Sequence, residues 1–318
     1  MKFDMLNYRY PSRRSVIYGR KGMVCTSQPL AAQAGLDILK KGGNAVDAMI
    51  ATAICMTVLE PTGNGLGSDA FDLVWFGGKL YGLNGSGGAP KLQTLEKMKA
   101  KGYDSMPQRG WDSVTVPGAV SAWGELHRRF GRLPFKELFA AAIDYAENGY
   151  PVHPIVGRLW NDAAKVFMPF RDKPEFRPFL ETFLKNGAPA VGSVVKLPDH
   201  ARTLRELAET NCESFYRGRI AAAFDAFSKE TGGLLRAEDL AAYRAEWGEP
   251  IRTNYKGYEV CEIPPNGHGI TVLMALGILD GMTMPENRES AEHYHKVIEA
   301  IKLAFADTKT YVADPRYM

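Results

Sequence analysis

A short polar run in the first third of the sequence has the residue types to bind a small molecule. Residues 84–88 read Asn-Gly-Ser-Gly-Gly. Asn84 and Ser86 offer amide and hydroxyl donors, and Gly87 leaves its backbone N–H uncovered by a side chain. Two interpretations stay open: a backbone-lined pocket wall with Asn84 and Ser86 as donors, or a flexible glycine turn that binds nothing.

A second glycine-rich run precedes the first. Residues 60–71 read Glu-Pro-Thr-Gly-Asn-Gly-Leu-Gly-Ser-Asp-Ala-Phe, with glycines at 63, 65 and 67. Such glycines either let a helix and a strand pack tightly or bring bare backbone to a site. Asn64 could donate to a substrate, and a turn-forming asparagine is an equal alternative. Because no strand precedes this run and no lysine of a phosphate-binding loop follows it, we reject a phosphate site.

The six histidines and four cysteines form no metal-binding pattern. His293 and His295 stand two residues apart, so their side chains diverge on a helix. His268, between two glycines, either faces an active site or is an exposed loop residue. The cysteines include no C-x-x-C pair, and Cys55 in an apolar run reads as a buried thiol. We therefore expect no metal ion and no cofactor.

Composition excludes other function classes. The 39 basic and 36 acidic residues give a net charge of +3, which provides no electrostatic reason to bind nucleic acid. The longest apolar run, residues 48–59, is too short to cross a membrane and suits a buried core helix. No linker divides the chain, so we expect a single domain over 1–318. No apolar leader follows Met1, which predicts a cytoplasmic protein.

The elements that must position these residues follow from periodicity. Apolar spacing predicts an amphipathic helix over 29–41, and Asn44 should cap a second helix that Pro61 stops. Strands are expected over 71–76 and 79–83 with a Gly77-Gly78 hairpin turn, and over 259–263. Further helices are predicted over 134–148, 201–209, 271–279 (buried) and 291–306. This mixed order favours an α+β or layered arrangement over a parallel sheet.

Several blocks together resemble the gamma-glutamyltransferase family of N-terminal-nucleophile (Ntn) hydrolases. They are Gly-Gly-Asn-Ala-Val-Asp-Ala at 42–48 with the 60–71 run, Thr-Val-Pro-Gly-Ala-Val at 115–120 with Phe-Gly-Arg-Leu-Pro at 130–134, Ala-Glu-Asn-Gly-Tyr-Pro-Val at 146–152, Pro-Pro-Asn-Gly-His-Gly at 264–269, and Ala-Phe-Ala-Asp at 304–307 with Asp314-Pro315. The blocks stand in the family's order. The resemblance implies a four-layer αββα sandwich.

The resemblance also implies where the nucleophile lies. Family members are made as precursors that cut themselves before a threonine, whose hydroxyl attacks the substrate while its new amine acts as base. That threonine opens the small subunit and follows the last block, so this chain resembles a large subunit with no catalytic residue of its own. A companion small subunit is the expected partner, and a dimer of heterodimers stays open.

One segment departs from the family pattern. Counting back from Ala89 and Pro90, Ser86 occupies the position of the arginine that grips the substrate carboxylate in glutamyl transferases. A single neutral hydroxyl cannot replace a bidentate guanidinium. The segment resembles instead the branch of oxamate amidohydrolase and cephalosporin-acylase-like proteins, which implies hydrolysis of a small amide such as oxamate. Gamma-glutamyl hydrolysis or transfer, with Arg109 or Arg20 as the clamp, is the second hypothesis, and a non-catalytic scaffold is the third.

Overall fold

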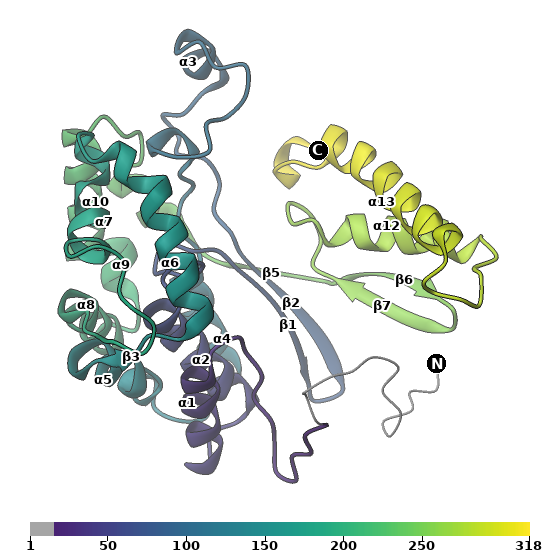
Figure 1. Cartoon of the computed structure of the whole chain (residues 1–318), viewed down its shortest axis with the longest axis horizontal. Coiled ribbons are helices and arrows are strands. Elements are labelled where there is room, and N and C mark those ends of the chain that lie inside the picture. The colour runs from purple at the N-terminus through teal and green to yellow at the C-terminus, as the bar shows by residue number, and fades with distance from the viewer. Residues whose placement is uncertain (1–15) are drawn as a thin grey trace.

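A computed structural model describes residues 16–318, so the first residues, on which the expectation about export rests, lie outside the described part. Helices α1 (Pro29–Lys40) and α2 (Ala45–Leu59) pack against each other at one end of the helical part of the molecule (Figure 1). Asn44 caps α2 as predicted, because its side chain accepts from the backbone N–H of Val46 and of Asp47, and the Asp47 carboxylate accepts from the Asn44 N–H.

Helix α2 forms the centre of a helical body. Its neighbours are α1, α4 (Ala119–Phe130), the 3₁₀ helix η2 (Phe135–Phe139) and α5 (Ala140–Asn148). Ile50 and Ile54 are fully buried, which confirms the prediction of a core helix. The body continues through α8 (Pro198–Glu209), α9 (Glu213–Arg217), α10 (Arg219–Glu230) and α11 (Ala237–Ala242).

A smaller apolar cluster joins α6 (Pro154–Phe167) to α7 (Arg177–Phe183). The remaining short elements are α3 (Leu95–Ala100), η1 (Trp111–Ser113), η3 (Met168–Phe170), η4 (Pro174–Phe176), η5 (Pro315–Tyr317) and the paired strands β3 (Tyr150–Pro151) and β4 (Val194–Val195).

The central sheet is antiparallel and carries the polar run at one end. Strands β1 (Ala70–Phe76) and β2 (Lys79–Gly85) form the predicted hairpin, and β5 (Glu246–Gly248) pairs with β2. One face packs on the helical body, where Leu83 is fully buried. The opposite face exposes Phe71, Leu73 and Trp75, the last by 69%. The residues that alternate with these three on β1 therefore point toward the helical body.

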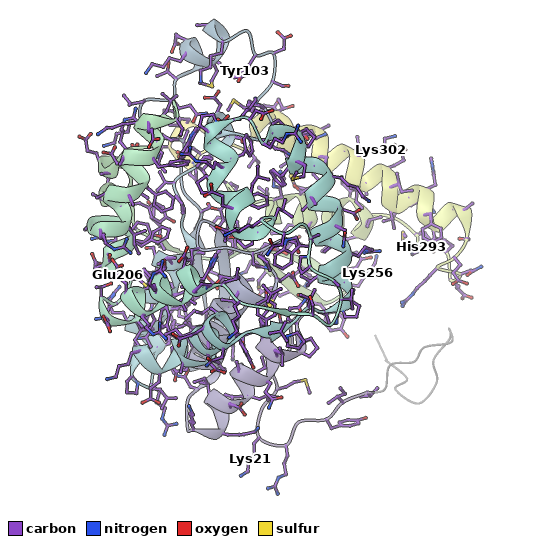
Figure 2. The ribbon with its side chains drawn as sticks, turned by 60° about the vertical axis from the view of Figure 1, so that its left-hand side comes forward. Lys21, Tyr103, Glu206, Lys256, His293 and Lys302 are labelled. Carbon is purple, nitrogen blue, oxygen red and sulfur yellow. The ribbon has the colours of Figure 1, made fainter. Side chains whose placement is uncertain are left out.

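The C-terminal elements stand beside the sheet, opposite the helical body (Figure 1). A second hairpin, β6 (Ile251–Tyr255) and β7 (Tyr258–Glu262), packs against α12 (Gly269–Asp280), and α13 (Ala291–Tyr311) covers α12. Figure 2 labels Lys256, His293 and Lys302 on these elements. The expectation that α12 is buried holds for only one face, since Val272 is 46% exposed. A helix that is apolar on all sides, like α12, does not reveal in its sequence how many of those sides are covered by neighbouring elements.

The described chain is α+β, as predicted, with helices dominating and every strand pair antiparallel. Within residues 16–318, none of the helices has the length and apolarity needed to cross a membrane. The same residues contain no cluster of three or more His, Cys, Asp or Glu side chains suited to a metal ion. The single-domain assignment over 1–318 stays a prediction.

Candidate functional site

Asn84 and Ser86 lie together at the end of β2. The Ser86 hydroxyl donates to Asn84 Oδ1 at 2.7 Å, and the Ser86 backbone N–H donates to the same oxygen at 2.9 Å. This local loop is the turn that a short amide side chain forms with the residue two positions on. The polar run is therefore held in a defined shape, which disfavours the interpretation as a flexible turn.

A third side chain, Asn266, closes this arrangement from the far end of the sequence. Asn84 Nδ2 donates to Asn266 Oδ1 at 2.8 Å, and Asn266 Nδ2 donates to Ser86 Oγ at 3.0 Å. All three side chains are half-buried. We call Asn84, Ser86 and Asn266 the amide–serine cluster. It ties the central hairpin to the segment that leads into α12.

Sequence reasoning missed Asn266 although it singled out the segment 264–269. It selected His268 there, because this residue interrupts a stretch that is rich in serine and glycine in the family pattern. In the structure His268 is exposed at the start of α12, with its ring centroid 6.3 Å from that of Phe305. An asparagine after two prolines, in neither a helix nor a strand pattern, was the signal that could have indicated a side-chain role.

Gly87 is required by close backbone packing. A Cβ at this position would lie 1.8 Å from the Val116 carbonyl oxygen, and the Val116 N–H donates to the Gly88 carbonyl at 3.0 Å. The Gly87 N–H also faces the carboxylate of Asp69, a residue that sequence reasoning did not select. Burial raises the pKa of Asp69, and the nearby Gly87 N–H partly opposes that shift. The predicted contact of Gly87 with substrate stays a prediction.

On the other side of the segment lies a guanidinium. A Cβ on Gly88 would lie 3.5 Å from Arg316 Nη2 and 3.9 Å from Asp314 Oδ2. Arg316 Nε donates to Asp314 Oδ1 at 2.9 Å, and this pair lowers the pKa of Asp314 to about 2. The arginines suggested from sequence lie elsewhere: the Arg109 guanidinium is 5.9 Å from the Phe167 ring centroid, and Arg20 is exposed before α1.

Asn64 is not joined to the amide–serine cluster by any contact in the described part of the chain. Its amide donates to Glu60 Oε1 at 3.3 Å, and Ser27 and Gln28 each donate to Glu60 Oε2 at 2.7 Å. These contacts favour its interpretation as a turn residue. The glycines beside it are not tightly packed, since a Cβ at Gly63 would meet its nearest atom only at 3.6 Å.

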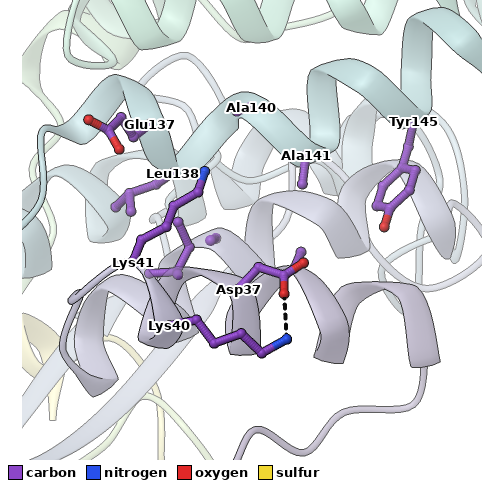
Figure 3. Close-up of a pocket in the computed structure, with 11 residues that line it drawn as sticks. Asp37, Lys40, Lys41, Glu137, Leu138, Ala140, Ala141 and Tyr145 are labelled. Atoms are coloured by element: carbon purple, nitrogen blue, oxygen red, sulfur yellow. Dashed lines mark hydrogen bonds and ion pairs between the residues drawn. The ribbon is translucent and has the colours of Figure 1, made fainter.

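A cavity of about 410 Å³ lies away from all these residues, between α1, α2, η2 and α5. Figure 3 shows Asp37 and Lys40 paired at 2.9 Å along it, with Lys41, Glu137 and Tyr145 around its edge. None of the side chains predicted for the site lines this cavity. The amide–serine cluster, and not this cavity, is therefore our candidate site.

The family can now be stated from comparison with known proteins. The family model described as gamma-glutamyltranspeptidase matches residues 31–318. This chain belongs to the gamma-glutamyltranspeptidase family. It is 35% identical over 312 residues to the glutathione hydrolase-like YwrD proenzyme of Bacillus subtilis, covering 96% of this chain and 57% of that protein. It is 36% identical over 305 residues to the oxamate amidohydrolase proenzyme of Klebsiella pneumoniae, covering 93% and 56%.

Solved structures of the family agree with this assignment. A cephalosporin acylase from Bacillus halodurans superposes with a TM-score of 0.93 at 53% identity, covering 99% of this chain and 59% of that one. A gamma-glutamyltranspeptidase from Pseudomonas nitroreducens gives 0.83 at 31% identity, covering 95% and 89%. The αββα fold expected from the resemblance is thus confirmed, with this chain as the large-subunit portion. The chain spans a little over half the length of the curated relatives it matches.

Proposed function

We propose that this chain, as one Ntn-hydrolase large subunit over 1–318, belongs to an autoprocessed enzyme that hydrolyses a small amide such as oxamate. The observation that carries the proposal is the amide–serine cluster at the position of the glutamyl-binding arginine. Ser86 is fixed there by Asn84 and Asn266 at 2.7 and 3.0 Å, so this wall offers neutral donors. Neutral donors fit a compact polar acyl group better than they fit the gamma-glutamyl carboxylate.

The nucleophile in this proposal is the N-terminal threonine of a companion small subunit. Its hydroxyl attacks the amide carbon while its amine takes the proton, the C–N bond breaks with release of ammonia or an amine, and water then hydrolyses the acyl-threonine ester. This division into two subunits is supported by two relatives that match 96% and 93% of this chain. Both are named proenzymes, and both are nearly twice as long as this chain.

The exposed face of β1 supports a companion subunit as well. Phe71, Leu73 and Trp75 are 47%, 41% and 69% exposed on one face of the sheet. Contiguous apolar surface of this kind marks a contact site, because its removal from water on binding lowers the free energy. In the proposed enzyme the small subunit covers this face and so brings its threonine beside the sheet that ends in Asn84.

The experiment is expression of the full-length gene followed by intact-mass analysis and an amide panel. We expect two fragments, the larger near or slightly above the 35.1 kDa of this chain. Release of ammonia or amine should require the threonine that opens the small fragment, and its replacement by alanine is the control. An uncut polypeptide with full activity would contradict the proposal, and a cut but inactive protein would favour the scaffold hypothesis.

A second candidate, gamma-glutamyl hydrolysis or transfer, is favoured by one observation. Arg316 brings a guanidinium to within 3.5 Å of the Cβ position of Gly88, two residues from Ser86. A side-by-side assay of gamma-glutamyl-p-nitroanilide and small dicarboxylic monoamides separates the candidates. Loss of an uncompensated charge-assisted contact should lower kcat/KM for the glutamyl compound by roughly 30-fold to several-thousand-fold relative to ordinary family members. Full glutamyl activity that Arg316→Ala abolishes would establish the second candidate.

A further inference from the structure

The hydroxyl of Ser86 has no donor left for a substrate. A serine hydroxyl has one proton, and both acceptors within its reach belong to the cluster: Asn84 Oδ1 at 2.7 Å and Asn266 Oδ1 at 3.3 Å. The Ser86 oxygen in turn accepts the Nδ2 proton of Asn266 at 3.0 Å. A ligand that took the serine proton would have to break the shorter of these bonds. Ser86 therefore holds its two neighbours in place and does not itself present a donor.

The two asparagines, by contrast, have more N–H donors than the cluster uses. Each side-chain amide carries two N–H groups. Asn84 uses one toward Asn266 at 2.8 Å, and Asn266 uses one toward Ser86 at 3.0 Å. The second N–H of each has no partner within residues 16–318, and both residues are half-buried and thus still reachable.

The position of Asn266 follows from how its segment lies along the central hairpin. A Cβ on Gly82 of β2 would meet Ile263 Cδ1 at 3.0 Å, and a Cβ on Gly267 would meet the Phe71 ring at 3.3 Å. Phe71 is the register partner of Asn84 across β1 and β2. The chain from 263 to 267 therefore runs beside the strand end, which places Asn266 against Asn84.

We propose that Asn266 is a substrate-binding residue of this enzyme. With Asn84 it presents amide N–H donors to an oxygen on the acyl group, and Ser86 is the positioning residue that orients both amides. The acceptor is a carbonyl or carboxylate oxygen on the acyl side of the scissile amide. The inference rests on the proposed amide hydrolysis and adds the chemical feature that the acyl group must carry.

The experiment uses the processed full-length enzyme and two amides that release ammonia. One is the fastest oxygen-bearing amide of the panel, oxamate or succinamate, and the other has a methyl group in place of the carboxylate. We expect wild type to favour the oxygen-bearing amide by at least about tenfold in kcat/KM, and Asn266→Asp and Asn266→Ala to lower that preference by about tenfold. Asn266→Asp keeps an acceptor for Asn84 but adds a negative charge as it removes the N–H donors, and Asn266→Ala, which adds no charge, separates the loss of donors from charge repulsion.

Controls separate binding from folding. Asn254→Asp changes an asparagine of β6 whose Oδ1 accepts from the Gly257 N–H at 3.2 Å, within the same C-terminal elements, and it should leave the preference unchanged. Ser86→Ala should lower the preference mainly through KM. Equal activity of wild type toward both amides would overturn the inference. Asn266 variants that retain the preference would also overturn it. The same holds if the variants lose activity only to the extent that less of the protein has cleaved itself.

The two levels of the proposal fail in different ways. If wild type hydrolyses no amide, the proposed function fails and this inference fails with it. If wild type hydrolyses amides without regard to the acyl oxygen, only the role of Asn266 is refuted. Should every Asn266 variant, including the milder Asn266→Ser, stop self-cleavage, then Asn266 is structural and the assignment to substrate binding is wrong.

Discussion

Replacing Gly87 by alanine tests whether the polar wall depends on its backbone packing. The added Cβ would lie 1.8 Å from the Val116 carbonyl oxygen, whereas ordinary contact begins near 3.4 Å, so the segment must shift by about 1.5 Å. The clashing atom belongs to the backbone and cannot rotate away. Overpacking of this kind costs about 1–3 kcal/mol.

The shift should also break a hydrogen bond that holds the segment. The Val116 N–H donates to the Gly88 carbonyl at 3.0 Å. At about 1 kcal/mol, its loss brings the expected destabilisation to about 2–4 kcal/mol. Because the wall that we propose positions the substrate would move by more than an ångström, kcat/KM should fall by about 100-fold.

The assay is urea unfolding of the full-length enzyme together with kcat/KM for its fastest amide. Gly124→Ala is the matched control, since this residue lies inside α4 and a Cβ there would meet only the Asn211 carbonyl oxygen at 4.0 Å. Alanine in a helix interior should stabilise by up to about 1 kcal/mol. Gly87→Ala with the wild-type urea midpoint and wild-type activity would refute the reasoning.

Three further predictions concern the scaffold, each read from urea unfolding. Ile54→Ala should destabilise by about 2–5 kcal/mol because the side chain is fully buried in α2, and a loss below 1 kcal/mol would show that the site collapses freely. Asp47→Asn should cost about 1–3 kcal/mol, since its carboxylate accepts from the backbone N–H of Asn44 and of Arg132, each at 3.0 Å; an unchanged midpoint would contradict this. Burial raises the pKa of Asp72 from 3.8 to about 6, and one of its carboxylate oxygens is unpaired. Wild type should therefore lose about 2 kcal/mol of stability relative to Asp72→Asn as the pH rises from 4 to 7, and parallel pH profiles would exclude this.

Local patterns were sufficient to predict the main scaffold. The Asn44 cap, the apolar run of α2 and the Gly77-Gly78 turn each follow from a few neighbouring residues, and each is present in the structure. The same kind of reasoning placed Asn84 and Ser86 at the end of a strand. It could not find Asn266, because the bond between Asn84 and Asn266 joins residues 182 positions apart.

The predictions that depended on distant packing fared less well. Helix α12 is apolar all round, and sequence alone could not reveal that only one of its faces meets β6, β7 and α13 in this chain. Asn64 and His268 were chosen for their residue type within family blocks. Their side chains are directed to Glu60 and toward Phe305, because local turns and helix starts decide their orientation.

Ser86, which the family resemblance places at the position of the glutamyl-binding arginine, cannot be considered alone. Asn266 Nδ2 lies 3.0 Å from Ser86 Oγ, in space that a longer side chain at 86 would need. A small hydroxyl at 86 and an asparagine at 266 therefore belong together, since each is placed by the other. An arginine introduced at 86 would displace Asn266 and loosen its attachment to β2 before it could reach a carboxylate. In the proposed enzyme, specificity at this wall is thus a joint property of the central hairpin and the segment before α12, and a single substitution should not convert it to the glutamyl type.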